Sequence, residues 1–193
     1  MRVLELWRLA VRLVFQPAEG WEAIARAPLG ARDLILGIAL PLSLLPAVGT
    51  LVGMTVMAPA LGPAHGYLLG GDRAMPAVLT TLVASMATVF VLAGVFVALA
   101  PMYRSRRDYL AALNVAVLGA APLWLAGILL VLPALALVSL VAFCHSAYLY
   151  YVGAGEVLRV EADSRADFVG ISMVLIAVLS TFAGAAASSL GLM

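Results

Sequence analysis

Four long stretches of the chain contain no aspartate, glutamate, lysine or arginine, and this pattern constrains the fold more than any other feature. They cover residues 34–71, 74–103, 109–155 and 168–193. A helix needs about 20 apolar residues to cross the hydrocarbon core of a bilayer, so each stretch allows at least one crossing. Hydrophobic residues make up 65% of the chain and charged residues only 11%, whereas roughly 25% of residues in soluble domains are charged. This composition excludes a soluble enzyme, a disordered chain and a secreted disulfide scaffold.

The charge-free stretches predict five membrane-spanning helices. The stretch 109–155 is long enough for two crossings, and Pro133 near its middle marks the turn between them. The first stretch holds one crossing, because its second half, 58–71, has the Gly- and Pro-rich composition of a loop. We expect spans at about 34–57, 77–100, 109–131, 134–155 and 168–190. The predicted fold class is therefore all-α: a polytopic membrane helical bundle, residues 34–193, preceded by an amphipathic segment, residues 1–33.

Arginine supplies all eleven basic residues, and its distribution predicts the orientation in the membrane. Ten arginines precede the first expected span or follow the second or the fourth, and only Arg73 falls on the other side. Loops rich in lysine and arginine stay in the cytoplasm. We therefore expect a cytoplasmic N-terminus and a C-terminus on the opposite side. The arginine- and alanine-rich composition is typical of a GC-rich bacterial genome, so the predicted location is the bacterial cytoplasmic (inner) membrane.

The first fifteen residues predict an interfacial amphipathic helix. Their charged residues recur at steps of three or four, so they share one helix face, and apolar residues cover the rest. Such a helix lies in the plane of the membrane with its arginines toward anionic head groups. It either anchors the first span or senses and shapes the bilayer. We expect lipid head-group contacts from Arg2, Arg8 and Arg12, and from Arg104, Arg106 and Arg107 in the loop after the second span.

Polar residues in the third and fourth expected spans form a candidate intramembrane site. His145 is predicted near the bilayer midplane, where an ionisable group suggests function. Tyr148 and Tyr151 continue its helix face. Asn114 lies about 8 Å deep at 1.5 Å per residue, so we expect it to bond Tyr148. The alternative is a neutral His145 bonded to a neighbouring helix, with the tyrosines forming an interfacial aromatic belt.

Two further patterns concern packing. Gly49 and Gly53 form a GxxxG motif in the first span, which serves either an internal helix contact or a homo-oligomer. The loop 156–167 alternates acidic and basic residues, so it is either a solvated connector or docks against loop 103–108. In the docked arrangement, the arginines of loop 103–108 would pair with Glu161 and Asp163. Exposed pairs contribute only about 0–1 kcal/mol each, so they would fix loop geometry without holding the fold together.

Sequence patterns for catalysis are absent. The chain has no HExxH, no Gly-x-Ser-x-Gly elbow, no phosphate-binding loop and no lysine for a Schiff base. Two histidines and one cysteine do not make a structural zinc site. We therefore expect no enzyme activity and no catalytic residues, no metal, no cofactor and no nucleic-acid partner. The expected partners are the lipid bilayer, its anionic lipids and further copies of the chain.

Several short motifs occur in an order that resembles a known family. The motifs are Phe15-Gln16-Pro17, Ala121-Pro122-Leu123, Leu132-Pro133-Ala134-Leu135 and Tyr148-Leu149-Tyr150-Tyr151-Val152-Gly153. With the five-span topology, they resemble bacterial members of the Yip family, the Ypt/Rab-interacting membrane proteins, over about residues 10–185. Eukaryotic members of that family shape membranes and contact prenylated GTPases through a long cytosolic N-terminal region. Only about 33 residues precede the first expected span here, which argues against a GTPase partner.

Two functions stay open on the sequence. The first is a non-enzymatic integral membrane protein that organises or remodels the bilayer, or scaffolds membrane partners, through its amphipathic helix and arginine-rich loops. The alternative is a small transporter, channel or lipid-moving protein with a polar track in the third and fourth spans. The alternative requires that Asn114, His145 and Tyr148 line one water-accessible space.

Overall fold

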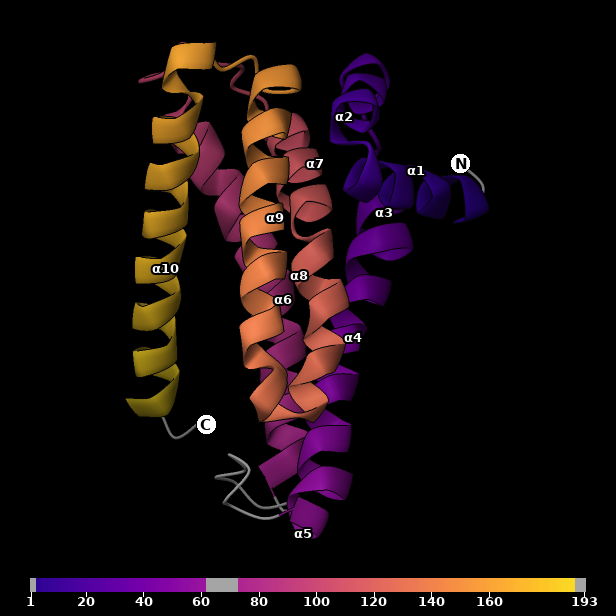
Figure 1. Cartoon of the computed structure of the whole chain (residues 1–193). Helices are drawn as coiled ribbons and strands as arrows, with labels where there is room; N and C mark the ends of the chain where they lie inside the picture. Colours follow the sequence, from indigo (N-terminus) through magenta and orange to yellow (C-terminus); the bar gives the residue numbers. More distant parts are fainter. Residues whose placement is uncertain (1–2, 62–72, 190–193) are drawn as a thin grey trace.

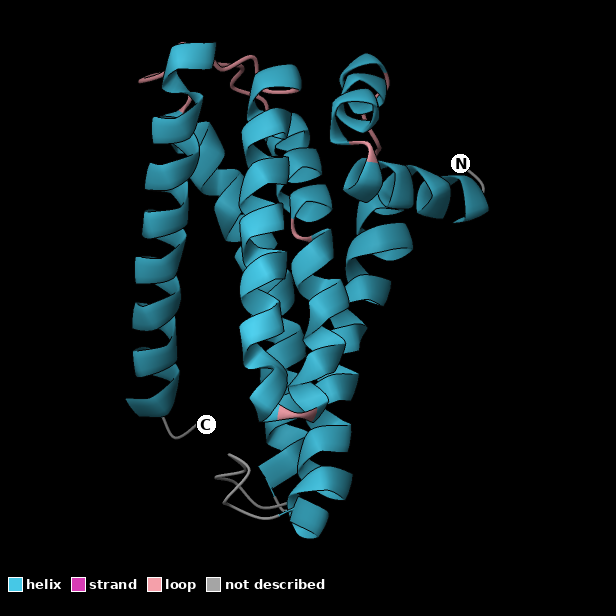
Figure 2. Cartoon of the chain, in the orientation of Figure 1, coloured by secondary structure: helices cyan, strands magenta, loops and turns pink. Residues whose placement is uncertain are grey.

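The computed structural model describes residues 3–61 and 73–189, and every regular element in that part of the chain is a helix (Figures 1 and 2). Five helical runs are long and apolar enough to cross a membrane, which confirms the predicted fold class. They are Ala31–Leu61, Ala74–Leu99, Tyr109–Val131, Leu137–Glu156 and Ala162–Ala185. Two helices precede them: α1 (Val3–Phe15) and α2 (Pro17–Arg26).

The first span is irregular, because two short π-helical segments interrupt it. Its segments are α3 (Ala31–Leu34), η1 (Ile35–Ala39), α4 (Leu40–Val52), η2 (Gly53–Met57) and α5 (Ala58–Leu61). Pro41, the second residue of α4, lies just after η1 and has no N–H to donate to a carbonyl in that segment, whereas α4 continues through Pro46 with one hydrogen bond missing. The prediction of a loop from residue 58 was wrong for α5, because apolar backbone in a bilayer gains by staying helical. The remainder of that predicted loop, 62–71, lies outside the described residues.

The third span lies at the centre of the bundle. It consists of α7 (Tyr109–Gly119), α8 (Ala121–Ala126) and the 3₁₀ segment η5 (Gly127–Val131). Every residue of α7 from Ala111 onward is buried. Asp108 caps α7 by accepting hydrogen bonds from the backbone N–H groups of Ala111 and Leu110. The Ala111 hydrogen bond and the neighbouring Arg106 guanidinium lower the pKa of the Asp108 carboxyl.

The remaining spans surround this centre. The second is α6 (Ala74–Leu99), the fourth is η6 (Pro133–Leu135) with α9 (Ala136–Glu156), and the fifth is η7 (Ala162–Ser164) with α10 (Arg165–Ser189). Phe168 at the start of α10 stacks on Phe96 of α6, with ring centroids 5.4 Å apart. Beyond Ser172, the described side chains of α10 are exposed or half-buried. The fifth span is therefore fixed to the bundle at one end only, and stands apart at the other (Figure 1).

The glycines of the GxxxG motif lie at an internal contact between the first and third spans. A Cβ atom on Gly49 would lie 2.6 Å from the carbonyl oxygen of Gly127, and one on Gly53 would lie 2.9 Å from that of Leu130. Gly127 in turn faces Pro46, whose Cα would be 2.9 Å from an added Cβ. Backbone therefore packs directly on backbone, which only glycine permits at these distances.

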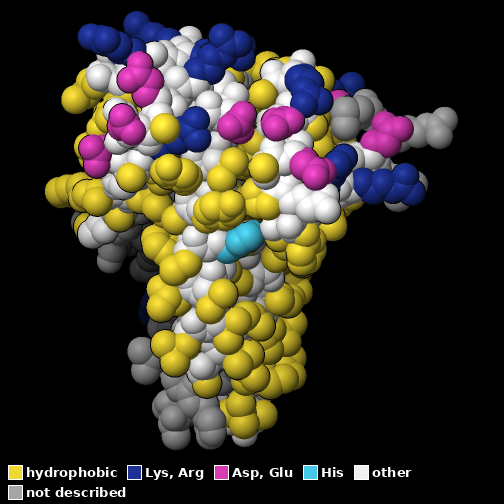
Figure 3. Space-filling model, turned by 45° about the horizontal axis from the view of Figure 1, so that its top comes forward, with side chains coloured by type: hydrophobic (Ala, Val, Ile, Leu, Met, Phe, Trp, Pro, Cys, Tyr) yellow, Lys and Arg dark blue, Asp and Glu magenta, His cyan; other side chains and the backbone are white. Residues whose placement is uncertain are grey.

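One end of the bundle carries nearly all the described charges. We call it the arginine-rich end: it contains α1, α2, loop 100–108 and loop 157–161 (Figure 1). Figure 3 shows arginine and acidic side chains gathered over this end, with an apolar surface over the rest of the visible face. The three segments that the arginine count predicted to share one side do lie together.

A main-chain hydrogen bond joins the two loops at this end, and the ion pairs of the docked alternative are not formed. The backbone N–H of Arg106 donates to the carbonyl of Leu158 over 2.7 Å. The Arg106 side chain bonds instead to Asp108 in its own loop, at 2.5 Å. Glu161 and Asp163 are exposed and form no ion pair in the described part of the chain. Of the two arrangements left open by the sequence, the ion-paired one is not found, and these two side chains lie in solvent as in the connector alternative.

Candidate functional site

Helix α1 lies across the direction of the spans and projects beyond the edge of the bundle (Figure 1). Its side chains divide into three faces, because residues three and four apart in a helix share a side. The docked face, with Leu6, Ala10 and Leu13, is buried against the rest of the protein. The other two faces are an apolar one, whose Trp7 is half-buried against the core, and a charged one, which is exposed.

Close contacts at two glycines explain why α1 docks where it does. A Cβ on Gly37 in η1 would lie 2.7 Å from Cδ1 of Leu6, so Leu6 occupies the space that a larger residue would fill. A Cβ on Gly20 in α2 would lie 2.8 Å from the Cα of Leu13, which brings the backbones of α1 and α2 together. The docked face is thus held at one end by the first span and at the other by α2.

His145 of the fourth span fixes the end of α1. Its Nε2 lies 3.0 Å from the carbonyl oxygen of Val14. A carbonyl oxygen can only accept, so Nε2 carries the hydrogen in this contact. The last carbonyls of a helix have no partner within the helix, and a donor from elsewhere satisfies one of them here. This geometry matches the alternative raised from the sequence, in which His145 is bonded to a neighbouring helix.

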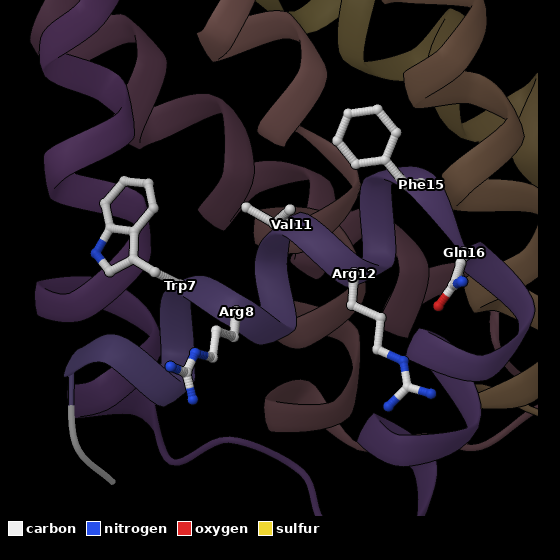
Figure 4. Close-up of a pocket in the computed structure, with 6 residues that line it drawn as sticks. All are labelled: Trp7, Arg8, Val11, Arg12, Phe15 and Gln16. Carbon is white, nitrogen blue, oxygen red and sulfur yellow. The ribbon is translucent and has the colours of Figure 1, made fainter.

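The apolar face of α1 is the exposed feature most relevant to a membrane. Val11 is 53% exposed and Phe15 is 79% exposed, and Trp7 lies on the same side. Arg8 and Arg12 point to the opposite side in the close-up view (Figure 4). All six residues labelled in Figure 4, which include Gln16, border a surface hollow of about 410 Å³. Arg12 also forms an ion pair with Glu19 of α2.

The segment that follows α1 is anchored equally firmly. Trp21 and Ile24 of α2 are fully buried. A Cβ on Gly153 of α9 would lie 2.9 Å from the indole ring of Trp21, so this glycine makes room for the ring. Helix α2 therefore packs on α9 through an aromatic side chain.

Asn114 attaches the end of the N-terminal segment to the third span through two hydrogen bonds to the backbone of Leu29, which we call the Asn114 clamp. The Leu29 N–H donates to Oδ1 of Asn114 over 3.1 Å, and Nδ2 donates to the Leu29 carbonyl over 3.0 Å. Nδ2 also donates to the carbonyl of Leu110, at 2.9 Å. The predicted Asn114–Tyr148 hydrogen bond was wrong: both amide hydrogens are already used, and Tyr148 is 52% exposed on another surface.

The predicted intramembrane residues are therefore not gathered at one place. His145 and Tyr148 are neighbours, with ring centroids 6.3 Å apart. Tyr151 is exposed, while Asn114 is fully buried in α7 and bonded to backbone. These side chains do not form a continuous polar path along the third and fourth spans, so the geometry gives no support to the transport hypothesis.

The predicted head-group arginines lie at the arginine-rich end, except Arg2, which lies outside the described residues. Arg8, Arg12, Arg104, Arg106 and Arg107 are all exposed. Sequence reasoning did not separate the apolar face of α1 from its docked face. The signal available was spacing: Trp7, Val11 and Phe15 recur every four residues, and so form a stripe of their own.

Replacing His145 by alanine is expected to loosen α1 while leaving the spans folded. The variant loses one hydrogen bond to a helix end, worth about 1 kcal/mol, so amide exchange in α1 should speed up roughly fivefold. Hydrogen exchange followed by mass spectrometry measures this. Tyr148→Phe is the matched control, since it alters the same face without removing a described hydrogen bond. Unchanged protection of α1 in His145→Ala would show that the contact does not hold the helix.

Comparison with known proteins gives one match. The family model of the Yip1 domain matches residues 11–184, from within α1 to the last turns of α10. No curated protein matches the chain, and no solved structure matches it.

Proposed function

The chain belongs to the Yip1 domain family, in line with the resemblance seen in its motifs, and we propose that it organises or remodels the bilayer through α1. In this proposal α1 lies in the interface of one leaflet, inserts its apolar face among acyl chains and turns its arginines to anionic head groups. The observation that carries the proposal is the three-faced helix. One face is docked on a rigid bundle, and the two others expose Val11 and Phe15 beside Arg8 and Arg12.

The docking makes this arrangement different from a free amphipathic peptide. A free helix is not fixed in depth or tilt, and it loses conformational entropy when it binds the membrane. Here α1 is held by Leu6, Leu13 and the His145 hydrogen bond before it meets lipid. Its side chains therefore occupy area in one leaflet at a fixed distance from the spans, and added area in one leaflet favours curvature.

The arginines supply the electrostatic attraction between the protein and anionic lipid. Arg104 and Arg107 are exposed and form no ion pair in the described part of the chain, so they are available to lipid phosphates. Each basic residue near an anionic surface contributes about 1 kcal/mol of attraction. We propose that the arginine-rich end faces the cytoplasm, as the bias of ten arginines out of eleven favours. On this proposal the protein is a multi-pass protein of the bacterial cytoplasmic membrane.

Phe15→Glu is expected to abolish remodelling while leaving the fold intact. Phe15 is 79% exposed, so the glutamate meets no packed neighbour, but it cannot enter the acyl region. Purified protein is reconstituted into anionic vesicles, and vesicle diameters are measured by electron microscopy. The wild-type protein should shift the diameters, and Phe15→Glu should leave them as in empty vesicles. Met102→Glu is the matched control, since Met102 is 73% exposed at the same end but lies outside α1.

Varying the lipid charge in the same assay separates the contribution of the charged face of α1 from that of its apolar face. Arg8→Glu should weaken the effect in anionic vesicles and change little in neutral ones, because it alters only head-group attraction. If wild-type protein leaves anionic vesicles unchanged, or if Met102→Glu acts as strongly as Phe15→Glu, α1 is not the remodelling element.

A further inference from the structure

A groove separates α6 from α10 in the half of the spans away from the arginine-rich end. It extends from Leu79 to Val91 along α6 and from Ile176 to Gly184 along α10, and its volume is about 500 Å³. It exists because the buried residues of α10, Phe168, Val169 and Ser172, lie in its first turns, and its packing on the core continues only through Met173 and Ile176. Further along, Leu179 is 45% exposed, and the small residues Ala183 and Gly184 leave the space open.

We propose that this groove binds one acyl chain of a phospholipid from the leaflet opposite the arginine-rich end. The inference concerns a separate site, and it does not depend on the proposed role of α1. The groove-lining parts of both helices lie in charge-free stretches of sequence, so in a membrane the groove opens to hydrocarbon. Its walls are mostly apolar, with Leu79, Val83 and Ile176 among the lining residues.

The size of the groove suits one acyl chain. The stretch Leu79–Val91 is about 18 Å long at 1.5 Å per residue, close to the ~15 Å that one leaflet contributes to the hydrocarbon core. The groove volume of about 500 Å³ lies within the roughly 300–1,000 Å³ of small-molecule sites. One hydrocarbon chain therefore matches the groove in length and in volume.

Polar groups along α6 are arranged in the order that a phospholipid requires. Arg73 precedes the first turn of α6 and is exposed, about 9 Å before the groove begins at 1.5 Å per residue. It supplies a positive charge for the phosphate. The Thr80 hydroxyl lines the groove at the end that is closer to Arg73. It forms no hydrogen bond in the described part of the chain, so it can donate to an ester carbonyl. By contrast, the neighbouring Thr81 hydroxyl bonds back to Ala77 of its own helix.

Photo-crosslinking with a defined lipid tests the site. Full-length protein is reconstituted with a phosphatidylglycerol that carries a photoactivatable group in one acyl chain, and adducts are mapped by mass spectrometry. We expect adducts concentrated on 79–91 and 176–184. Ala183→Phe should remove them by filling the groove. Ala185→Phe is the matched control, because Ala185 is an exposed alanine of the same helix that does not line the groove.

The other outcomes are distinct. Adducts spread evenly over all lipid-facing helices, or unchanged by Ala183→Phe, would show ordinary surrounding lipid and overturn the proposal. Cross-links between copies through α10 would show that a second copy occupies the groove, and would also overturn it. Ala84→Phe blocks the groove from α6 and decides the matter if Ala183→Phe fails to fold. Arg73→Gln should lower the adduct yield for phosphatidylglycerol but not for a diacylglycerol that carries the same chain.

Discussion

Gly49→Ala is expected to destabilise the bundle severely. The new Cβ would lie 2.6 Å from the carbonyl oxygen of Gly127 and 3.2 Å from the Cα of Ile128, and both atoms belong to backbone that cannot rotate away. The first and third spans must therefore separate, and overpacking of this kind costs about 1–3 kcal/mol or more. The unfolding temperature of the purified protein in detergent should fall clearly below that of the wild type.

Gly94→Ala provides the matched control. Gly94 is also a helical glycine within a span, but a Cβ there would meet nothing within 4 Å. Alanine is favoured over glycine in a helix by about 1 kcal/mol, so this variant should unfold at the same or a higher temperature. Equal unfolding temperatures for the two variants would contradict the close contact at Gly49.

Asn114→Leu is expected to release the N-terminal segment from the bundle. Leucine matches asparagine in size but leaves the N–H and the carbonyl of buried Leu29 without partners. Each unpaired buried group costs about 1–3 kcal/mol. In detergent, trypsin should then cut after Arg26 and Arg32 much faster than in the wild type, while fragments from the other spans stay protected.

Thr181→Val separates this effect from the general loss of a polar side chain. The Thr181 hydroxyl bonds only to the carbonyl of Ala177 in its own helix, so its removal should not change cleavage after Arg26. If Asn114→Leu is cut no faster than Thr181→Val, the clamp does not hold the segment. The proposed function would then lose the rigid attachment on which it depends.

Much of the fold can be predicted from the sequence because a bilayer imposes simple rules. Charges are excluded from hydrocarbon, so the charge-free stretches marked all five spans. Pro133 marked the turn between the third and fourth spans, and Pro122 lies at the break between α7 and α8. The ends of the spans could not be predicted in the same way, because composition does not mark a helix end within apolar sequence. The first span, for example, continues through α5 beyond its predicted end at residue 57.

The candidate site could be predicted only in part, for reasons that differ between residues. Asn114 was recognisable as unusual, but its partner is the backbone of Leu29, and a backbone group leaves no trace in the residue pattern. The same holds for His145 and the carbonyl of Val14. In α1, Leu13 docks on protein while Val11 is exposed, and both are simply apolar in sequence. Spacing places them on different stripes, and only the tertiary structure shows which stripe docks.

These contacts give the N-terminal segment a consistent role. The Asn114 clamp, the Trp21–Gly153 contact and the His145 hydrogen bond all attach α1 and α2 to the spans. None of them covers the face that carries Val11 and Phe15. Several buried contacts thus hold an exposed apolar surface in one orientation, which is the property that the proposed function needs.

The depth of α1 in a bilayer tests this account most directly. Nitroxide labels are placed one at a time at Val11→Cys and Arg8→Cys in a Cys144→Ser background, and the protein is reconstituted in anionic vesicles. Accessibility to oxygen and to a water-soluble nickel chelate is then measured by electron paramagnetic resonance. We predict that the label at position 11 is accessible to oxygen and shielded from nickel, and that the label at position 8 shows the reverse. Equal exposure of both labels to nickel would place α1 in water and contradict the account.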